Sequence, residues 1–347
     1  MGDRGDRRAG LTIVKTGEVI AGNVGQDDLR RTHTLWAHGS AEITFVEAKV
    51  FFHLFDEEDL AFMLGVSRVA TGKALKTLEE KRLIKLRYGI GEALAKTFSA
   101  NGADIILSGR RVDALQAVAD QLPTETLVLP FEVTDYSELE AIVVKAWDWK
   151  GKVDVLVNNA GVSQRSLAIH TAPQVYTDLI NIDLIAPIWL TQLQLPRMVE
   201  AGGAHIIAIS SVAGRFGPPL RTAYAAAKHG LIGYMDALRT EVSARHNINV
   251  TNVLPGSVAT NVSRNAFTAS GSIRGKSDAA IEGGDDPMDC ARAILEAVDN
   301  NVPELIFASG MELDLAKLRH SDPEKLFELG SQFGAQIAEQ YESGDDS

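Results

Sequence analysis

The sequence predicts an α/β fold built on a doubly wound parallel sheet, preceded by an atypical N-terminal helical extension. From about residue 89 onward, short apolar runs alternate with amphipathic stretches of helical length. The runs are rich in Val, Ile and Leu at consecutive positions, as expected for parallel strands buried on both faces. Charge also changes along the chain: residues 1–88 hold 14 Lys or Arg against 13 Asp or Glu, and the remainder holds 20 against 33. The two parts are therefore expected to differ in structure.

The expected elements follow one another in strand–helix order. Strands are predicted at 103–108, 126–131, 153–158, 205–210, 249–254 and 304–308. Helices are predicted at 90–100, 112–121, 136–150, 173–200, 223–245, 287–300 and 323–341. Repeated units of this length are typical of a doubly wound sheet, in which ligands bind at the carboxyl ends of the strands.

Composition excludes several classes of protein. The 347 residues are 45% hydrophobic and 23% charged, which is the balance of a globular protein. No apolar run approaches the ~18–20 residues that span a bilayer, and the polar start predicts no signal peptide. The single cysteine, Cys290, predicts neither an internal disulfide nor a metal site, so a cytoplasmic location is expected. The net charge of −12 argues against a general nucleic-acid binder.

The segment 56–88 carries a second pattern. A short helix is expected to end at Gly65, and Ser67 is placed to cap a second helix. This resembles the winged helix-turn-helix of cyclic-AMP-receptor-type regulators, which implies a DNA-reading helix with Arg68, Thr71, Lys73 and Lys76. The alternative is two packed amphipathic helices with solvated charges, and nucleic-acid binding is expected only if the first reading holds.

Tyr224 and Lys228 give the strongest chemical signal. They are four residues apart on a predicted helix and so share a face. An ammonium near a phenol favours the phenolate, which makes Tyr224 a usable general acid or base. A Tyr and a Lys at this spacing are also common on helix surfaces, so the pair by itself does not identify an active site.

Three further motifs end strands at the same sheet edge. Asn158-Asn159-Ala160-Gly161 ends the strand 153–158, Ser211 follows the strand 205–210, and Pro255-Gly256 follows the strand 249–254. Because the carboxyl ends of parallel strands meet at one edge, these motifs converge with Tyr224 on one site.

Together these motifs resemble the short-chain dehydrogenase/reductase superfamily, over about residues 89–320. The stretches Val162-Ser163-Gln164-Arg165-Ser166 and Ala226-Ala227-Lys228-His229-Gly230-Leu231 are similar to the branch related to 11β-hydroxysteroid dehydrogenases and its bacterial relatives. The resemblance implies a Rossmann-like domain at 82–320, between an extension at 1–81 and a C-terminal helix and acidic tail at 321–347. It also implies a homo-oligomer built through the long helices 173–200 and 223–245.

The resemblance assigns roles to individual residues. Tyr224 would exchange a proton with the substrate oxygen, Ser211 would hydrogen-bond that oxygen, and Lys228 would favour the phenolate and bind the nicotinamide ribose. The other cofactor-binding positions implied are Gly89, Ile90, Gly91, Glu132, Val133, Asn158, Ala160, Gly161, Pro255, Gly256, Val258 and Thr260. Arg110 and Arg111 follow the predicted strand 103–108, which corresponds to the family's second strand, where NAD enzymes carry an acid, so NADP(H) is favoured and NAD(H) stays possible.

Two departures from the family pattern stand out. The family has an asparagine in its proton relay. Aligning this sequence with the family on Leu190-Thr191-Gln192 puts Asp183 at that position, and Asn181 lies two residues earlier. The glycine-rich loop keeps only Gly89-Ile90-Gly91, and the usual central first strand is replaced by the more polar 82–86. Three accounts stay open: 82–86 fills the strand position, an earlier segment such as 43–52 fills it, or the chain is a fusion that folds poorly.

The sequence therefore predicts an NADP(H)-dependent oxidoreductase acting on a small-molecule carbonyl or alcohol. The alternatives are a nucleotide-sensing or DNA-binding regulator without enzymatic activity, and a catalytically impaired fusion lacking an intact cofactor loop. The Gly- and Ser-rich region 261–286 is expected to close the substrate pocket.

Overall fold

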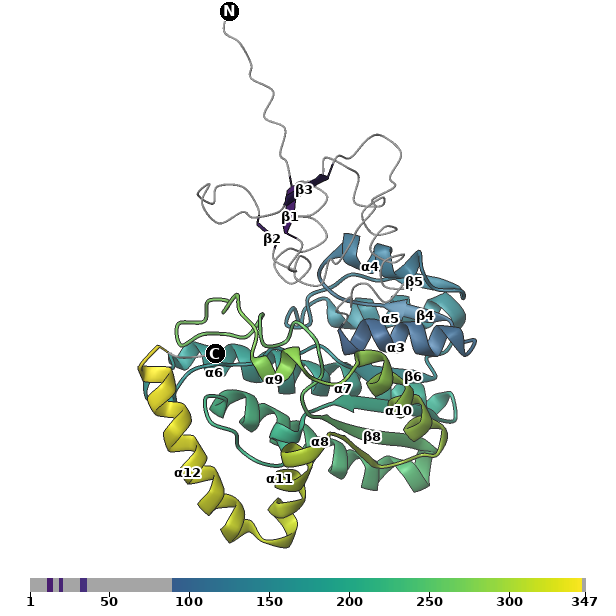
Figure 1. The fold of residues 1–347 in the computed structure, drawn as a ribbon. Helices are drawn as coiled ribbons and strands as arrows, with labels where there is room; N and C mark the ends of the chain where they lie inside the picture. Colours follow the sequence, from purple (N-terminus) through teal and green to yellow (C-terminus); the bar gives the residue numbers. More distant parts are fainter. Residues whose placement is uncertain (1–10, 15–18, 21–31, 36–88, 345–347) are drawn as a thin grey trace, which may run out of the picture. The chain divides into compact units, whose positions relative to one another are not determined.

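The computed structural model describes residues 11–14, 19–20, 32–35 and 89–344 (Figure 1). The chain divides into two compact units, residues 1–87 and 88–347. In the first unit, β1 (Leu11–Val14) pairs antiparallel with both β2 (Val19–Ile20) and β3 (Thr32–Leu35). The sequence did not predict this small sheet. The helix-turn-helix predicted at 56–88 lies outside the described residues, as does the apolar segment 43–52.

The second unit has the predicted alternation of strands and helices. Its strands are β4 (Ile105–Leu107), β5 (Thr126–Val128), β6 (Val155–Asn158), β7 (Ala204–Ile209), β8 (Ile248–Pro255) and β9 (Glu304–Phe307). Its helices are α3 (Ile90–Ala100), α4 (Val112–Ala119), α5 (Leu139–Lys150), α6 (Pro173–Ile180), α7 (Ala186–Glu200), α8 (Thr222–His246), α9 (Ala279–Glu282), α10 (Pro287–Asp299), α11 (Gly310–Ser321) and α12 (Pro323–Glu342). The predicted α/β fold with a Rossmann-like parallel sheet is confirmed.

These strands form two groups, and all pairs are parallel. One sheet has the order β6-β7-β8-β9, and the other contains only β4 and β5. Among the described residues, no strand joins β4 to β6, which is where a doubly wound sheet has its first strand. The segment predicted to fill that position, 82–86, lies outside the described residues.

Helices cover both faces of the four-stranded sheet. Successive side chains of β7 alternate: Ile206 and Ala208 pack with α5, α7 and α8, whereas Ile207 and Ile209 pack with α3 and α10. All four β7 side chains are at most 6% exposed. Two apolar layers of this kind explain why the strand sequence is continuously hydrophobic rather than alternating.

Local signals fix several helix ends. Asp286 caps α10 by accepting a hydrogen bond from the Met288 amide at 2.8 Å, and Pro287 starts the helix. α5 ends at Gly151, whose φ of 75° a residue with a side chain adopts only at a cost. The predicted helix 173–200 is interrupted, because residues Asn181–Ile185 form a π-helical turn, η3, between α6 and α7.

The C-terminal region adds one helix that the sequence did not predict, α11. Figure 1 shows α12, in yellow, reaching away from the sheet beyond α11. Leu326 is the buried residue of α12, while Phe327 and Phe333 are 58% and 47% exposed. Of the helices in the described part of the chain, none is long and apolar enough to cross a bilayer.

Candidate active site

Ser211 lies directly after β7, at the carboxyl edge of the sheet. Its side chain accepts a hydrogen bond from the Ala213 amide at 3.1 Å and donates one to the Pro255 carbonyl at 3.3 Å. These bonds connect the end of β7 to the end of β8. The hydroxyl is therefore held in a defined place where both strands stop.

Tyr224 and Lys228 lie one turn apart near the start of α8. Tyr224 shares a small cleft with Ser211 and Gly256, which the sequence predicted to meet there. The complete lining of the cleft is Ser163, Ser211, Arg221, Tyr224, Gly256, Val262, Ser263 and Ile281. Lys228 lies deeper: it is 3% exposed, its Nζ is 5.6 Å from the centre of the Tyr224 ring, and it donates to the Ile209 carbonyl at 3.0 Å.

Asp183, one of the two candidates for the proton relay, stands beside Lys228. Its Oδ2 is 3.1 Å from Lys228 Nζ, and its Oδ1 accepts a hydrogen bond from the Val162 amide at 2.8 Å. The side chains of Asp183 and Lys228 are 0% and 4% exposed. The π turn η3 carries the carboxylate into this position.

Gly161 packs closely against this ion pair. A Cβ at position 161 would lie 3.1 Å from Asp183 Oδ2 and 3.3 Å from Lys228 Nζ. Both partners are buried and fixed, so a side chain here would push them apart. This is a packing reason for the last glycine of Asn158-Asn159-Ala160-Gly161.

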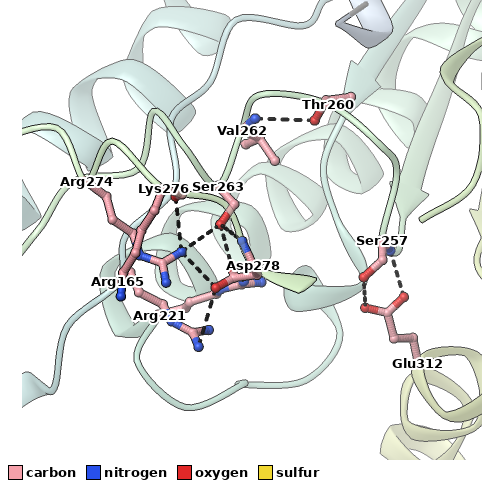
Figure 2. A network of polar contacts seen from close by, with 10 residues as sticks. All are labelled: Arg165, Arg221, Ser257, Thr260, Val262, Ser263, Arg274, Lys276, Asp278 and Glu312. Atoms are coloured by element: carbon pink, nitrogen blue, oxygen red, sulfur yellow. Dashed lines mark hydrogen bonds and ion pairs between the residues drawn. The ribbon is translucent and has the colours of Figure 1, made fainter. Parts of the chain in front are cut away.

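A network of arginines around Asp278 borders the cleft (Figure 2). Asp278 Oδ2 accepts from Arg221 at 2.8 Å and from the Ser263 hydroxyl at 2.7 Å, and its Oδ1 lies 2.8 Å from Arg274 and 3.5 Å from Arg165. Burial alone would raise the pKa of the Asp278 carboxyl, but the Ser263 hydrogen bond and the three guanidinium groups hold it below its ordinary value. The network ties the segment 261–286 to the start of α8.

A second tie holds the turn after β8 (Figure 2). Glu312 of α11 accepts hydrogen bonds from the Ser257 amide at 2.7 Å and the Ser257 hydroxyl at 2.9 Å. Farther along, the Thr260 hydroxyl accepts from the Val262 amide at 3.3 Å. Val258 and Thr260 are 3% and 6% exposed, so these two predicted positions belong to a fixed turn.

The two asparagines at the end of β6 contact different helices, Asn158 contacting α7 and Asn159 lying close to Gly91 of α3. The buried Asn158 side chain donates to the Thr191 hydroxyl at 3.1 Å, so it fastens β6 to α7. A Cβ at Gly91 would lie only 2.5 Å from the side-chain nitrogen (Nδ2) of Asn159. Gly89 stands directly before α3. Because it has no side chain, it forms no side-chain cap on the first backbone amides of the helix.

Arg110 and Glu132 face each other at the far end of the same edge. They follow β4 and β5, and the Arg110 Nε lies 3.5 Å from the Glu132 carboxylate. Their side chains are 76% and 40% exposed. The neighbours Arg111 and Val133 are exposed and half-buried, respectively.

Sequence reasoning missed the polar residues that hold the site together. Gln164 is fully buried, and its Oε1 accepts from the Ala223 amide at the start of α8 at 2.8 Å. Its only sequence signal was its place in the Ser-Gln-Arg-Ser stretch. Asp278 and Glu312 gave no signal, because their partners are 57 and 55 residues away along the chain.

The residues at this edge fit a nicotinamide dinucleotide. Backbone amides at the start of an α-helix such as α3 suit a pyrophosphate, and the glycines at 89, 91, 161 and 256 place no side chains on the backbone at this edge. Within the described ranges, no group of three or more His, Cys, Asp or Glu side chains could hold a metal ion. Burial raises the pKa of the Cys290 thiol to about 12, so this cysteine belongs to the core and not to the chemistry.

The fold is a parallel α/β sheet with Ser211 at its carboxyl edge and Tyr224 and Lys228 beside it on α8, the arrangement expected of an α/β oxidoreductase. A family model described as short chain dehydrogenase matches residues 86–271. The Anopheles gambiae Dehydrogenase/reductase SDR family protein 7-like is 36% identical over 69% of this chain and 78% of its own length. The Bos taurus Dehydrogenase/reductase SDR family member 7B is 34% identical over 70% and 77%. The chain belongs to the short-chain dehydrogenase/reductase family.

Solved structures agree with this fold. A short-chain dehydrogenase from Streptomyces avermitilis has 26% identity and a TM-score of 0.57, covering 74% of this chain and 95% of its own. A Burkholderia phymatum family member in complex with NAD has 22% identity and a TM-score of 0.61 over 68% and 90%. A Sphingobium yanoikuyae dehydrogenase in complex with NADPH has 25% identity and a TM-score of 0.55 over 63% and 83%.

Proposed function

We propose that this enzyme interconverts a carbonyl and a secondary alcohol with NADP(H), using Tyr224 as the general acid or base. The observation that carries the proposal is the cleft that Tyr224 shares with Ser211 and Gly256, above the buried Lys228. The nicotinamide, when bound, supplies or accepts the hydride.

Residues of this chain would transfer the proton and bind the substrate oxygen. Tyr224 passes a proton to the substrate oxygen during reduction and takes it back during oxidation. Ser211, held by the Ala213 amide, would turn its hydroxyl hydrogen from the Pro255 carbonyl to that oxygen. Lys228 keeps its ammonium group under the Tyr224 ring.

The cofactor would lie along the same edge. Gly89, Ile90 and Gly91 would meet the pyrophosphate, and Asn158, Ala160 and Gly161 would line the adenosine side through their backbone. Lys228 would bind the nicotinamide ribose, and Pro255, Gly256, Val258 and Thr260 would border the nicotinamide. Arg110 and Arg111, with Glu132 and Val133 opposite, would surround the adenine ribose, where exposed guanidinium groups favour a 2′-phosphate over a free hydroxyl.

Tyr224→Phe tests the proposal. Removing the phenolic proton should lower turnover about 10²–10⁴-fold and leave NADPH binding unchanged. Turnover of a panel of ketones and alcohols is measured beside nicotinamide fluorescence and thermal shift. Tyr234→Phe is the matched control, because Tyr234 lies farther along α8, outside the cleft, and binds Gln192. Equal turnover of wild type and Tyr224→Phe would rule out the assigned role.

A homo-oligomer built through the helices predicted at 173–200 and 223–245, which the structure shows as α6, η3 and α7 and as α8, remains a prediction, and light scattering measures it directly. A cytoplasmic location remains a prediction as well. The two alternatives, a regulator without enzymatic activity and a catalytically impaired fusion, do not require turnover that depends on Tyr224. The Tyr224→Phe experiment therefore distinguishes them from the proposed enzyme.

A further inference from the structure

Arg221 is the one charged residue that lines the Tyr224 cleft in the described part of the chain. It stands directly before α8, three residues ahead of Tyr224. The other lining residues carry hydroxyl groups or apolar side chains, apart from Gly256, which has no side chain. A guanidinium stays protonated throughout the pH range in which proteins fold. The cleft therefore presents a positive charge beside the candidate catalytic tyrosine.

The guanidinium group of Arg221 has donors left for a ligand. Its Nη2 donates to Asp278 Oδ2 at 2.8 Å, and Asp278 is its only hydrogen-bond partner among the described residues (Figure 2). A guanidinium carries five N–H donors, so this single bond leaves most of them unused. The side chain is 22% exposed and lines the cleft, so a molecule in the cleft can reach these donors.

Asp278 holds Arg221 in place without neutralising it alone. The same carboxylate lies 2.8 Å from Arg274 and 3.5 Å from Arg165, and it accepts a hydrogen bond from Ser263. One negative charge is thus shared among three guanidinium groups. A side chain that is already fixed loses little conformational freedom when a ligand binds, so Arg221 is prepared for binding.

The rest of the cleft offers two further kinds of surface. Ser211 and Tyr224 are the pair that the proposed reaction needs at the substrate oxygen, and Val262 and Ile281 add apolar surface. A matching ligand therefore has a carbonyl or hydroxyl oxygen, an acidic group and an apolar part. Side chains three residues apart at a helix start have Cβ atoms about 5–6 Å apart. This separation of Arg221 from Tyr224 suits an acidic group one carbon removed from the reacting carbon.

Resting on the proposed function, we propose that Arg221 binds the carboxylate of an apolar β-hydroxy or β-oxo acid and so determines the substrate class. Hydrogen bonds from a guanidinium to a carboxylate are about twice as strong as those between neutral groups. With the acid held by Arg221, the hydroxyl or carbonyl of the same molecule lies toward Tyr224 and Ser211. Its alkyl chain lies against Val262 and Ile281.

The test compares β-hydroxyhexanoate with β-hydroxyhexanamide, two molecules that differ in the charge of one end. Calorimetry measures the binding of each to the full chain, and kinetics with NADP⁺ give kcat/KM for each. Wild type should favour the acid about tenfold or more, because the amide cannot accept a hydrogen bond between two charges. Arg221→Met should bring the two to within about twofold of each other. The readout is the ratio of acid to amide, which a purely structural role of Arg221 would leave unchanged.

Arg245→Met is the matched control. Arg245 is an exposed arginine at the far end of the same helix, so its loss changes the net charge equally without touching the cleft. This variant should keep the preference of wild type for the acid. If it loses the preference to the same extent as Arg221→Met, long-range charge and not a contact is responsible, and the proposal is overturned.

The remaining outcomes are equally decisive. Equal affinity for acid and amide in wild type, no binding of the acid, or a retained preference in folded Arg221→Met overturns the proposal. If Arg221→Met does not fold, Arg221→Gln removes the charge and keeps a donor for Asp278. Turnover of the amide without a preference for the acid refutes the substrate class alone. Binding of the acid that depends on Arg221, without turnover in wild type, refutes the proposed activity alone.

Discussion

The two ends of the candidate site are built in opposite ways. At the Tyr224 end, Asp183, Lys228 and Gln164 are almost completely buried, and each has named partners. At the Arg110 end, the pairing with Glu132 is long, at 3.5 Å, and both side chains are substantially exposed. The first end resists change because every replacement leaves a buried group without its partner. The second end is adjustable, because water replaces a lost contact there at little cost.

The strongest way to challenge this contrast is to break the buried pair. Lys228→Met leaves the Asp183 carboxylate buried and uncompensated, which should lower the free energy of unfolding by about 3–5 kcal/mol. The loss should shrink as pH falls, because protonation removes the stranded charge. Chemical denaturation at several pH values measures it.

The double variant Lys228→Met/Asp183→Asn is the control for that experiment. It removes both charges and should regain most of the stability. If the single and double variants unfold alike, the ion pair is not what the fold depends on at this end.

An intermediate effect is expected at the Asp278 network, which borders the Tyr224 cleft. Asp278→Asn removes a carboxylate that binds Arg221, Arg274 and Ser263, at a cost of about 1–3 kcal/mol. Hydrogen exchange in 261–286 should become faster than in wild type. Asp289→Asn, which removes an exposed pair with Arg292 on α10, should leave that exchange unchanged.

The same network predicts a pH dependence for wild type. Because the folded-state pKa of Asp278 is lowered, its stabilisation is complete above the ordinary value of 3.8 and is lost as pH falls through the lower folded-state value. Protection of 261–286 should therefore hold at mildly acidic pH and decline only below about pH 4. In Asp278→Asn, this decline should be absent.

The smallest effect is expected at the exposed end. Arg110→Ala should weaken NADPH binding about tenfold, since a solvated contact to a phosphate contributes at the low end of charge-assisted hydrogen bonds. NADH binding, which offers no 2′-phosphate, should change little and serves as the internal control. Fluorescence titration of both cofactors measures the ratio. An equal loss for both would assign Arg110 to the adenosine rather than to the phosphate.

The same contrast explains what the sequence could predict. Tyr224 and Lys228 are one helical turn apart, and Ser211 and Gly256 each follow a strand, so short-range patterns were enough to bring them together. The helix 90–100 was predicted at its observed bounds, because apolar spacing follows directly after Gly89.

What the sequence missed depends on long separations. Arg221 and Asp278 are 57 residues apart, and no local pattern pairs them. The π turn Asn181–Ile185 was hidden because its residues continue the apolar pattern of the helices on either side. The small sheet β1–β3 has strands of two to four residues, too short for a periodic signal.

The π turn also sets the direction in which the Asp183 carboxylate points, because it fixes the angular position of this residue around the helix axis. An α-helix turns by about 100° per residue, so a turn holding one more residue rotates everything before it relative to everything after it. Deleting Leu184 from the turn would rotate the Asp183 carboxylate around the helix axis relative to α7, without altering the side chains of Asp183 and Lys228. For anyone redesigning this enzyme, the number of residues in that turn is as much a design variable as their identity.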